Sequence, residues 1–129
     1  SDARLKTDVR QIPEALELVK RLRGVRYRWR PAGDREAGKT LNLPTDEAQI
    51  GFIAQEVEAV VPEAVVAPRK GEGDGVYGLK ETNLLPVLVE AIKEQQAQIE
   101  ALRRDVAALK ASKLAALPVS VGAGSDARR

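Results

Sequence analysis

Apolar residues repeat at intervals of three and four along the last third of the chain. With Leu85 counted as position a of a heptad, we call the following a and d positions the seam: Leu85, Leu88, Ile92, Gln95, Ile99, Leu102, Val106 and Leu109. About four heptads of this kind predict a coiled-coil helix over residues 83–114, about 45 Å long. An amphipathic helix packed on its own domain is the alternative, but the rest of the chain is small for covering that length.

The composition favours an assembly of helices over a single large core. The chain has one Trp, two Tyr and one Phe, so its apolar content comes mainly from Leu, Val, Ala and Ile, which fits long helices and subunit interfaces. β-Branched residues at a with leucine at d nominally favour a parallel dimer. The polar Gln95 at a d position is compatible with a dimer or a trimer, because it can pair with its own copies.

Several function classes are excluded because the chain lacks two residue types and because its positive and negative charges nearly balance. It has no Cys and no His, which rules out a disulfide framework, a thiol nucleophile, a Ser-His-Asp triad and a His-ligated zinc site. We expect no cofactor and no metal. Charged residues make up 31% of 129 residues with a net charge of +2, which argues against an obligate nucleic-acid or membrane partner. The chain begins without Met, which predicts a fragment, a processed product or an engineered segment.

The remaining patterns predict short, mixed elements. We expect a helix over 13–23 ending at Gly24, strands over 25–30, 50–53, 64–67 and 76–80, and a short helix over 54–61 stopped by Pro62. Residues 31–48 are rich in Gly, Pro and charge and predict a loop or protruding arm. Tyr27, Trp29, Phe52 and Ile53 are expected in the core. The tail, residues 118–129, is predicted to be disordered.

The order of these blocks resembles a known family. SDARLK at Ser1–Lys6, the block Leu22–Trp29, the block Ile50–Pro62, VYGL and a coiled-coil helix follow one another as in the C-terminal intramolecular chaperone, or auto-processing peptidase, domain of phage tailspikes, tail fibres and endosialidases, also found in the myelin regulatory factor family. The resemblance covers residues 1 to about 110, and it rests on the order and spacing of the blocks together.

The resemblance implies an α+β fold: a small domain of helices and short strands with a loop arm at 31–48 and a long C-terminal coiled-coil helix. It implies one functional domain, residues 1–117, with a cleavage-site segment at 1–12, assembled as an intertwined homotrimer through the C-terminal helix. Such domains help an upstream fibre or β-helix of the same polypeptide to fold and then cut themselves off. The expected setting is a virion tail fibre or tailspike precursor made in the bacterial cytoplasm.

The resemblance also assigns roles at the Ser-Asp junction. Ser1 is implied as the nucleophile, Lys6 as its base, and Asp2 as the residue beside the cleaved bond, with Gln55 and Glu56 as candidate supporting residues. Arg4 is a further candidate, because its positive charge lies close to Lys6 in the sequence. A lysine base must be neutral, and lowering an ordinary lysine pKa by about 3 units costs about 4 kcal/mol, which requires burial or nearby positive charge. Residues five apart lie up to about 17 Å apart when extended, so either the segment bends or the lysine comes from a neighbouring chain.

Several of these residues also have purely structural interpretations. Gln55 and Glu56 can equally satisfy the N-terminal turn of a helix. The arginines at 26, 28 and 30 could bind phosphate, but a solvated strand face is the more common role of such residues. The rival functions are a trimeric structural cap that does not cleave and, with weaker support, a nucleic-acid module built on the basic strand.

Overall fold

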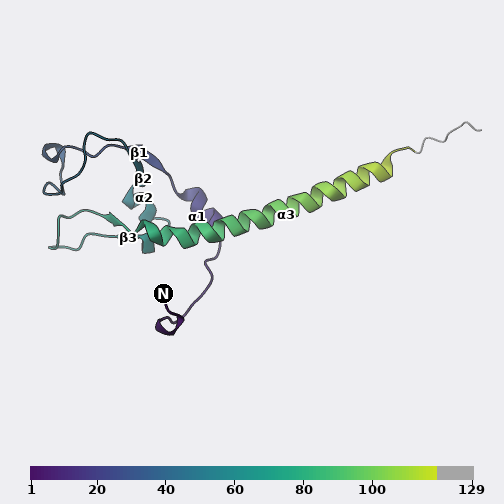
Figure 1. Ribbon diagram of the computed structural model, residues 1–129, viewed down its shortest axis with the longest axis horizontal. Coiled ribbons are helices and arrows are strands. Elements are labelled where there is room, and N and C mark those ends of the chain that lie inside the picture. The colour runs from purple at the N-terminus through teal and green to yellow at the C-terminus, as the bar shows by residue number, and fades with distance from the viewer. Residues whose placement is uncertain (119–129) are drawn as a thin grey trace, which may run out of the picture. The chain divides into compact units, whose positions relative to one another are not determined.

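The computed structural model describes residues 1–118 and divides the chain into two compact units, Ser1–Glu94 and a second that begins at Gln95. Figure 1 shows the order of the elements along the chain. The α-helices are α1 (Ala15–Arg21), α2 (Ala54–Glu58) and α3 (Leu85–Ala116), and the strands are β1 (Val25–Tyr27), β2 (Gln49–Gly51), β3 (Val65–Val66) and β4 (Gly78–Leu79). Short 3-10 helices are η1 (Ala3–Leu5), η2 (Ala32–Asp34), η3 (Pro62–Ala64) and η4 (Glu81–Leu84). The predicted α+β class with a long C-terminal helix is confirmed.

The four strands form two small antiparallel sheets in the first unit. β1 pairs with β2, so that Val25 lies opposite Gly51 and Tyr27 opposite Gln49. β3 pairs with β4 through Val65 and Leu79. The first sheet joins residues more than twenty positions apart, and its pairing brackets the loop at 31–48.

The core of the first unit is small and aliphatic. The buried residues are Ala15, Val57, Val61, Ala64, Leu84, Val87 and Ala91, and Phe52, Val60 and Leu79 are among the side chains packed against them. α1, α2, η3 and the first turns of α3 meet here. The expectation that Trp29 and Ile53 lie in the core was wrong, because they are 36% and 39% exposed. Trp29 follows the last paired residue of β1 and packs edge-on against Tyr27, with ring centroids 5.0 Å apart.

Val57 is the largest fully buried side chain of this core, at 1% exposure. Val57→Ala removes two methyl groups and leaves a small cavity, so the free energy of unfolding should fall by about 2 kcal/mol. Urea unfolding followed by circular dichroism measures the change. Val66→Ala is the matched control, because Val66 is 52% exposed, and it should change stability by less than about 0.5 kcal/mol. Equal losses in the two variants would contradict this description of the core.

Element boundaries differ from the sequence expectation for identifiable reasons. α1 begins at Ala15 rather than at Pro13 because Glu14 adopts a left-handed backbone conformation with φ 52°. It ends before Leu22, which is extended, and not at Gly24. β1 ends at Tyr27 because its partner β2 is three residues long. The predicted tail of residues 118–129 lies, apart from Pro118, outside the described residues.

The loop at 31–48 is held by an arginine that the sequence pattern did not single out. The Arg35 guanidinium donates hydrogen bonds to the carbonyl oxygens of Arg30, Gly38 and Leu41 at 2.7, 3.1 and 2.8 Å. The Thr40 hydroxyl also donates to the Asp74 carboxylate at 3.0 Å. This loop therefore has a defined internal structure and contacts the loop that precedes β4.

The first turns of α3 carry apolar residues on two faces. Val87 and Ala91 are buried in the core of the first unit, whereas Leu85 and Ile92, which belong to the seam, are 57% and 63% exposed. Packing on its own domain therefore accounts for one face of the helix start and leaves the seam uncovered.

Candidate functional site

The N-terminal segment is bent by the 3-10 turn η1. The amide nitrogens of Leu5 and Lys6 donate to the carbonyl oxygens of Asp2 and Ala3, each at 3.1 Å. Asp2 caps this turn, because its carboxylate accepts a hydrogen bond from the Arg4 amide at 2.8 Å. The turn shortens the path between the two ends of SDARLK, so residues five apart can meet within one chain.

Ser1 and Lys6 meet at the open side of this turn. The Lys6 ammonium donates to the Ser1 hydroxyl and lies 3.5 Å from the Ser1 carbonyl oxygen. Of the two routes that the sequence left open, a bent segment or a lysine from another chain, the structure contains the bent segment. Both side chains are exposed.

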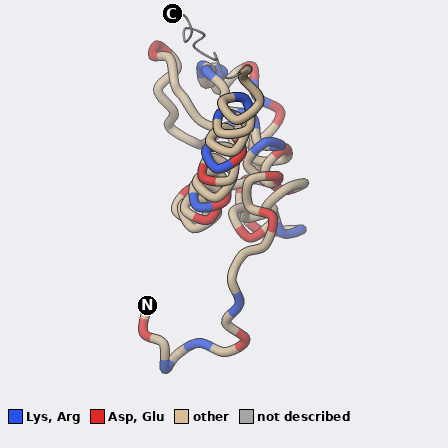
Figure 2. Tube along the Cα trace, turned by 90° about the vertical axis from the view of Figure 1, so that its right-hand side faces the viewer, with Lys and Arg blue, Asp and Glu red and all other residues tan. Residues whose placement is uncertain are grey.

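Asp2 and Arg4 form the second contact of the segment. The Arg4 guanidinium binds both oxygens of the Asp2 carboxylate, at 2.7 to 3.2 Å. These hydrogen bonds lower the pKa of the Asp2 carboxyl, the Arg4 side chain being the first cause and the Arg4 amide the second. Arg4 therefore acts on Asp2 and on the shape of the turn. Figure 2 shows acidic and basic residues following one another along this segment.

Gln55 and Glu56 lie on α2 and not at the Ser1–Lys6 contact. Glu56 binds the Arg23 guanidinium at 2.5 and 3.1 Å, which links α2 to the chain just after α1. Gln55 is exposed. Among residues 1–118, no hydrogen bond joins either residue to the N-terminal segment. In the single chain, Glu56 therefore links α2 to Arg23 and Gln55 is exposed, and neither residue is part of the Ser1–Lys6 contact.

The Arg23–Glu56 contact makes a pH-dependent contribution to stability. The Arg23 hydrogen bond lowers the pKa of the Glu56 carboxyl in the folded chain. A carboxyl with a lowered pKa stabilises the fold above its unfolded pKa, about 4.3 for Glu, and this contribution is lost as the pH falls through the folded value. Urea unfolding at pH 7 and pH 3 should show a smaller loss of stability in Glu56→Gln than in the wild type.

The control for this effect is the double variant. Because the contact is partly exposed, its contribution is small. Arg23→Ala added to Glu56→Gln should leave the pH dependence of Glu56→Gln unchanged. A further flattening in the double variant would mean that Arg23 acts on another carboxylate.

Two glutamates of α3 anchor the beginning of the chain, and the sequence analysis missed both. The Gln11 amide donates to the Glu90 carboxylate at 2.8 Å, and the Leu16 backbone amide donates to the Glu94 carboxylate. Hydrogen bonds from Gln11 and then from Lys93 lower the pKa of the Glu90 carboxyl. The signal in the sequence was an acidic pair at i and i+4 beside the buried positions Val87 and Ala91. These contacts connect the N-terminal part of the chain with α3.

Two further properties of the described chain bear on the chemistry. No group of three or more acidic, His or Cys side chains within residues 1–118 is arranged to bind a metal ion. No helix in that part of the chain combines the length and apolarity needed to cross a membrane.

These features define a class: a small α+β domain with a long C-terminal helix and a Ser-Lys contact in its N-terminal segment. The sequence profile of the family described as the chaperone of endosialidase matches residues 1–66, just over half of the chain. The chain belongs to this family, which carries the name of a peptidase family. The resemblance stated from the sequence is therefore confirmed.

Relatives and solved structures agree with this assignment. The chain is 29% identical over 102 residues to the long tail fiber protein Gp37 of Enterobacteria phage K3 and equally to that of Enterobacteria phage T2. These matches cover 79% of this chain and only 8% and 7% of those proteins. A crystal structure described as a novel intramolecular chaperone matches with a TM-score of 0.50 and 16% identity, covering 76% of this chain and 99% of that one. The structural match shows the fold.

Proposed function

We propose that this chain is an intramolecular chaperone that trimerises, assists the folding of an upstream fibre, and then releases itself by autoproteolysis at the Ser-Asp junction. Ser1 is the nucleophile and Lys6 the base. The observation that carries the proposal is the hydrogen bond between the Lys6 amine and the Ser1 hydroxyl within one chain. The absence of His from the sequence leaves lysine as the base for a serine nucleophile.

The chemistry follows the usual course of acyl transfer. Neutral Lys6 removes the proton from the Ser1 hydroxyl, whose oxygen attacks a backbone carbonyl carbon at the junction. The peptide C–N bond breaks, an ester to the Ser1 oxygen forms, and the leaving amine takes the proton from the Lys6 ammonium. Water then hydrolyses the ester and regenerates the hydroxyl. Backbone N–H groups are the expected donors to the oxyanion. One turnover is sufficient for release.

Assembly is proposed to complete this site. A lysine amine accepts a proton only when neutral, and burial favours its neutral form. Ser1 and Lys6 are exposed in the single chain, and the nearby Leu5 and Val9 are 86% and 77% exposed. Covering these apolar side chains in a trimer would remove water from the pair beside them. Cleavage would then follow assembly, which is the order that a folding aid needs.

The domain boundaries and partners belong to the same proposal. The functional domain comprises residues 1–117, with the cleavage-site segment at 1–12, a client-contacting arm at 31–48, and trimerisation through the helix at 83–114. The client is the fibre part of the same polypeptide, because the curated relatives are long tail fiber proteins far longer than this chain. Association with a virion tail fibre and synthesis in the bacterial cytoplasm follow from such a client.

The test uses the domain behind its natural upstream fibre segment. Intact mass should show a cut at the Ser-Asp junction, and light scattering after size exclusion should show a trimer before and after the cut. A fusion that stays whole while it is trimeric would establish the alternative, a structural trimerisation cap that does not cleave. A fusion that cuts as a monomer would refute the role of assembly.

A further inference from the structure

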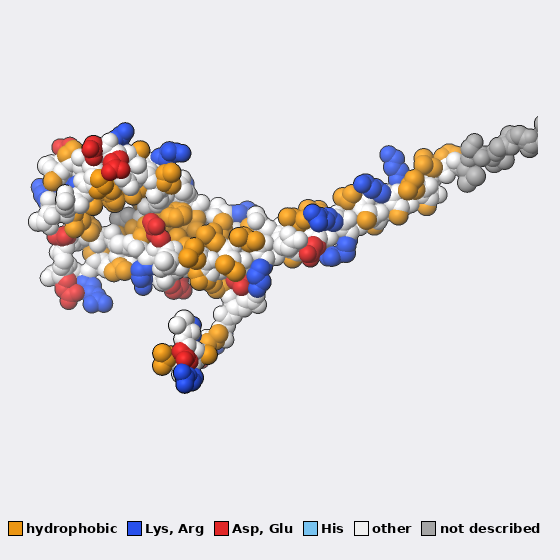
Figure 3. Space-filling model, in the orientation of Figure 1, with side chains coloured by type: hydrophobic (Ala, Val, Ile, Leu, Met, Phe, Trp, Pro, Cys, Tyr) orange, Lys and Arg blue, Asp and Glu red, His pale blue; other side chains and the backbone are white. Residues whose placement is uncertain are grey.

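The cleavage-site segment joins the rest of the first unit at Gln11. Residues 1–10 are exposed, and Figure 3 shows apolar and charged side chains together on this part of the segment. Among the hydrogen bonds within residues 1–118, those of residues 1–10 stay inside the segment. In the same part of the chain, Gln11 is the first residue to bind another element, and Ile12 beside it packs against the core. The direction of the chain at Gln11 therefore sets where the Ser1–Lys6 pair can lie.

Two glutamates on successive turns of α3 hold the chain at and just beyond this point. The Glu90 carboxylate accepts a hydrogen bond from the Gln11 amide at 2.8 Å and another from the Lys93 ammonium at 3.1 Å, so both of its oxygens are bound. The Glu94 carboxylate accepts a hydrogen bond from the backbone N–H of Leu16. We call the two contacts Gln11–Glu90 and Leu16–Glu94 the tether. Both glutamates are partly buried, a setting in which a carboxylate needs such partners.

The tether brackets a turn that local structure does not stabilise. Glu14 has a left-handed backbone conformation with φ 52°, and its side chain makes no capping hydrogen bond to α1. A residue other than glycine adopts this conformation at a cost and keeps it only where its surroundings impose it. The first amides of α1 need acceptors that the Glu14 side chain does not provide, and Glu94 supplies one to Leu16. α3 therefore stabilises the turn between the cleavage-site segment and α1.

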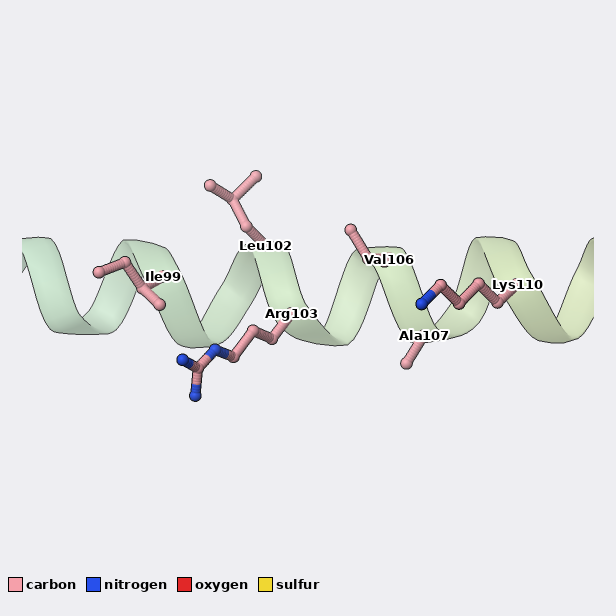
Figure 4. Close-up of a pocket in the computed structure, with 6 residues that line it drawn as sticks. All are labelled: Ile99, Leu102, Arg103, Val106, Ala107 and Lys110. Atoms are coloured by element: carbon pink, nitrogen blue, oxygen red, sulfur yellow. The ribbon is translucent and has the colours of Figure 1, made fainter.

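The tether and the seam occupy different positions of α3. In the heptad that starts at Leu85, Glu90 and Glu94 fall at f and c positions, whereas the seam takes the a and d positions. The helix also has a shallow hollow, shown in Figure 4, whose lining residues all belong to the second unit: Ile99, Leu102, Arg103, Val106, Ala107 and Lys110. Substitutions of the two glutamates therefore change neither the seam nor the lining of this hollow.

We propose that Glu90 and Glu94 are positioning residues for self-cleavage and that, through the tether, they limit the region in which the Ser1–Lys6 pair can move. The inference rests on the self-cleavage proposed above and adds the residues that direct the pair. Lys6 and Gln11 are five positions apart, up to about 17 Å in an extended chain, so a change of direction of about 20° at Gln11 would move the pair by about 6 Å. Displacement of reacting groups by about 1 Å is already enough to lower a rate substantially.

Cleavage of the domain behind its natural upstream fibre segment tests the positioning. Glu90→Ala should slow the cut about threefold, and Glu90→Ala with Glu94→Ala about tenfold, while the oligomeric state stays that of the wild type. The midpoint of the rate against pH should not move, because the Lys6 amine is unchanged, whereas a glutamate that acted on Lys6 through its charge would shift it. Glu100→Ala is the matched control, because Glu100 binds Gln96 within α3, and it should cleave at the wild-type rate.

An exchange of side chains tests the direct contact between Gln11 and Glu90. Gln11→Glu alone places two carboxylates together and should slow the cut. Gln11→Glu with Glu90→Gln restores one donor and one acceptor, so the rate should return to within about twofold of the wild type. A general loss of stability at Glu90 would not be repaired in this way. A double exchange no faster than Gln11→Glu, or wild-type cleavage after loss of both glutamates, would overturn the inference while the proposed function stands.

A distance measurement separates this inference from the proposed function. The chain has no Cys, so Ala3→Cys in η1 and Ala59→Cys, at an exposed position just after α2, can carry spin labels. In an uncut Ser1→Ala background diluted with unlabelled chains, pulsed electron paramagnetic resonance should give a narrower distance distribution with the tether than in the double alanine variant. Equal distributions would overturn the inference whether or not the wild type cleaves. A wild-type fusion that stays whole would overturn the proposed function, and the distances would still decide whether α3 holds the segment.

Discussion

Ser1→Ala should abolish self-cleavage of a fusion between the upstream fibre segment and this domain. The substitution removes the hydroxyl that the Lys6 amine contacts, so no ester can form, and the rate should fall by at least about a thousandfold. The uncut fusion should keep the oligomeric state of the wild type, since Ser1 is exposed and contributes nothing to the core. Intact mass over time measures the cut, and light scattering measures the assembly.

Substitutions of Lys6 distinguish two roles of this residue, that of the base that accepts a proton and that of a positive charge. Lys6→Arg keeps a positive group within reach of Ser1 but cannot give up its proton near neutral pH. Both Lys6→Arg and Lys6→Ala should therefore be uncut and still assembled. Lys20→Ala is the matched control, because Lys20 is an exposed lysine that pairs with Glu17, and it should cleave normally. Cleavage by Lys6→Arg at the wild-type rate would show that Lys6 is not the base.

The double variant Leu102→Glu and Leu109→Glu should dissociate the assembly. Burial of one leucine contributes about 1.5–3 kcal/mol, and two carboxylates per chain would replace two such side chains in the seam. The dissociation constant should rise by at least about a thousandfold. Circular dichroism should still report a folded first unit, because its buried residues all lie between Ala15 and Ala91.

Leu114 provides a control within the same helix. It is 69% exposed and falls at a b position outside the seam, so Leu114→Glu should leave assembly intact. Comparing cleavage in the two variants then tests whether assembly completes the Ser1–Lys6 site. Undiminished cleavage by the verified monomer would reject that dependence, and dissociation by Leu114→Glu would place the interface on another face of α3.

Local patterns predicted the kinds of element and the order in which they occur. The alternation of Val25, Arg26 and Tyr27 corresponds to β1, the AQEVE stretch is α2, and the apolar residues from Leu85 onward lie on α3. Each of these patterns is set by the period of a helix or a strand. The family was also evident from the order of the sequence blocks, and the profile match confirmed it.

Long-range contacts could not be predicted in the same way. Glu56 binds Arg23, and Gln11 binds Glu90. Arg35 binds two carbonyls of its own loop and the carbonyl of Arg30 just before it. No periodic pattern relates such partners, because their distance in the sequence depends on how the elements pack. The lengths of the strands were overestimated for the same reason, since a strand extends only as far as its partner does.

The sequence by itself predicted the heptad seam, because a seam depends on residue type and spacing. The order of its blocks also indicated the family, and that resemblance implied the α+β fold and the candidate roles of Ser1 and Lys6. Only the tertiary structure decided that the SDARLK segment bends so that Ser1 and Lys6 meet in one chain. It also decided that Val87 and Ala91 are buried while Leu85 and Ile92 stay exposed. The physical reason is that an apolar side chain is buried only where another element covers it, and a turn closes only where its hydrogen bonds can form.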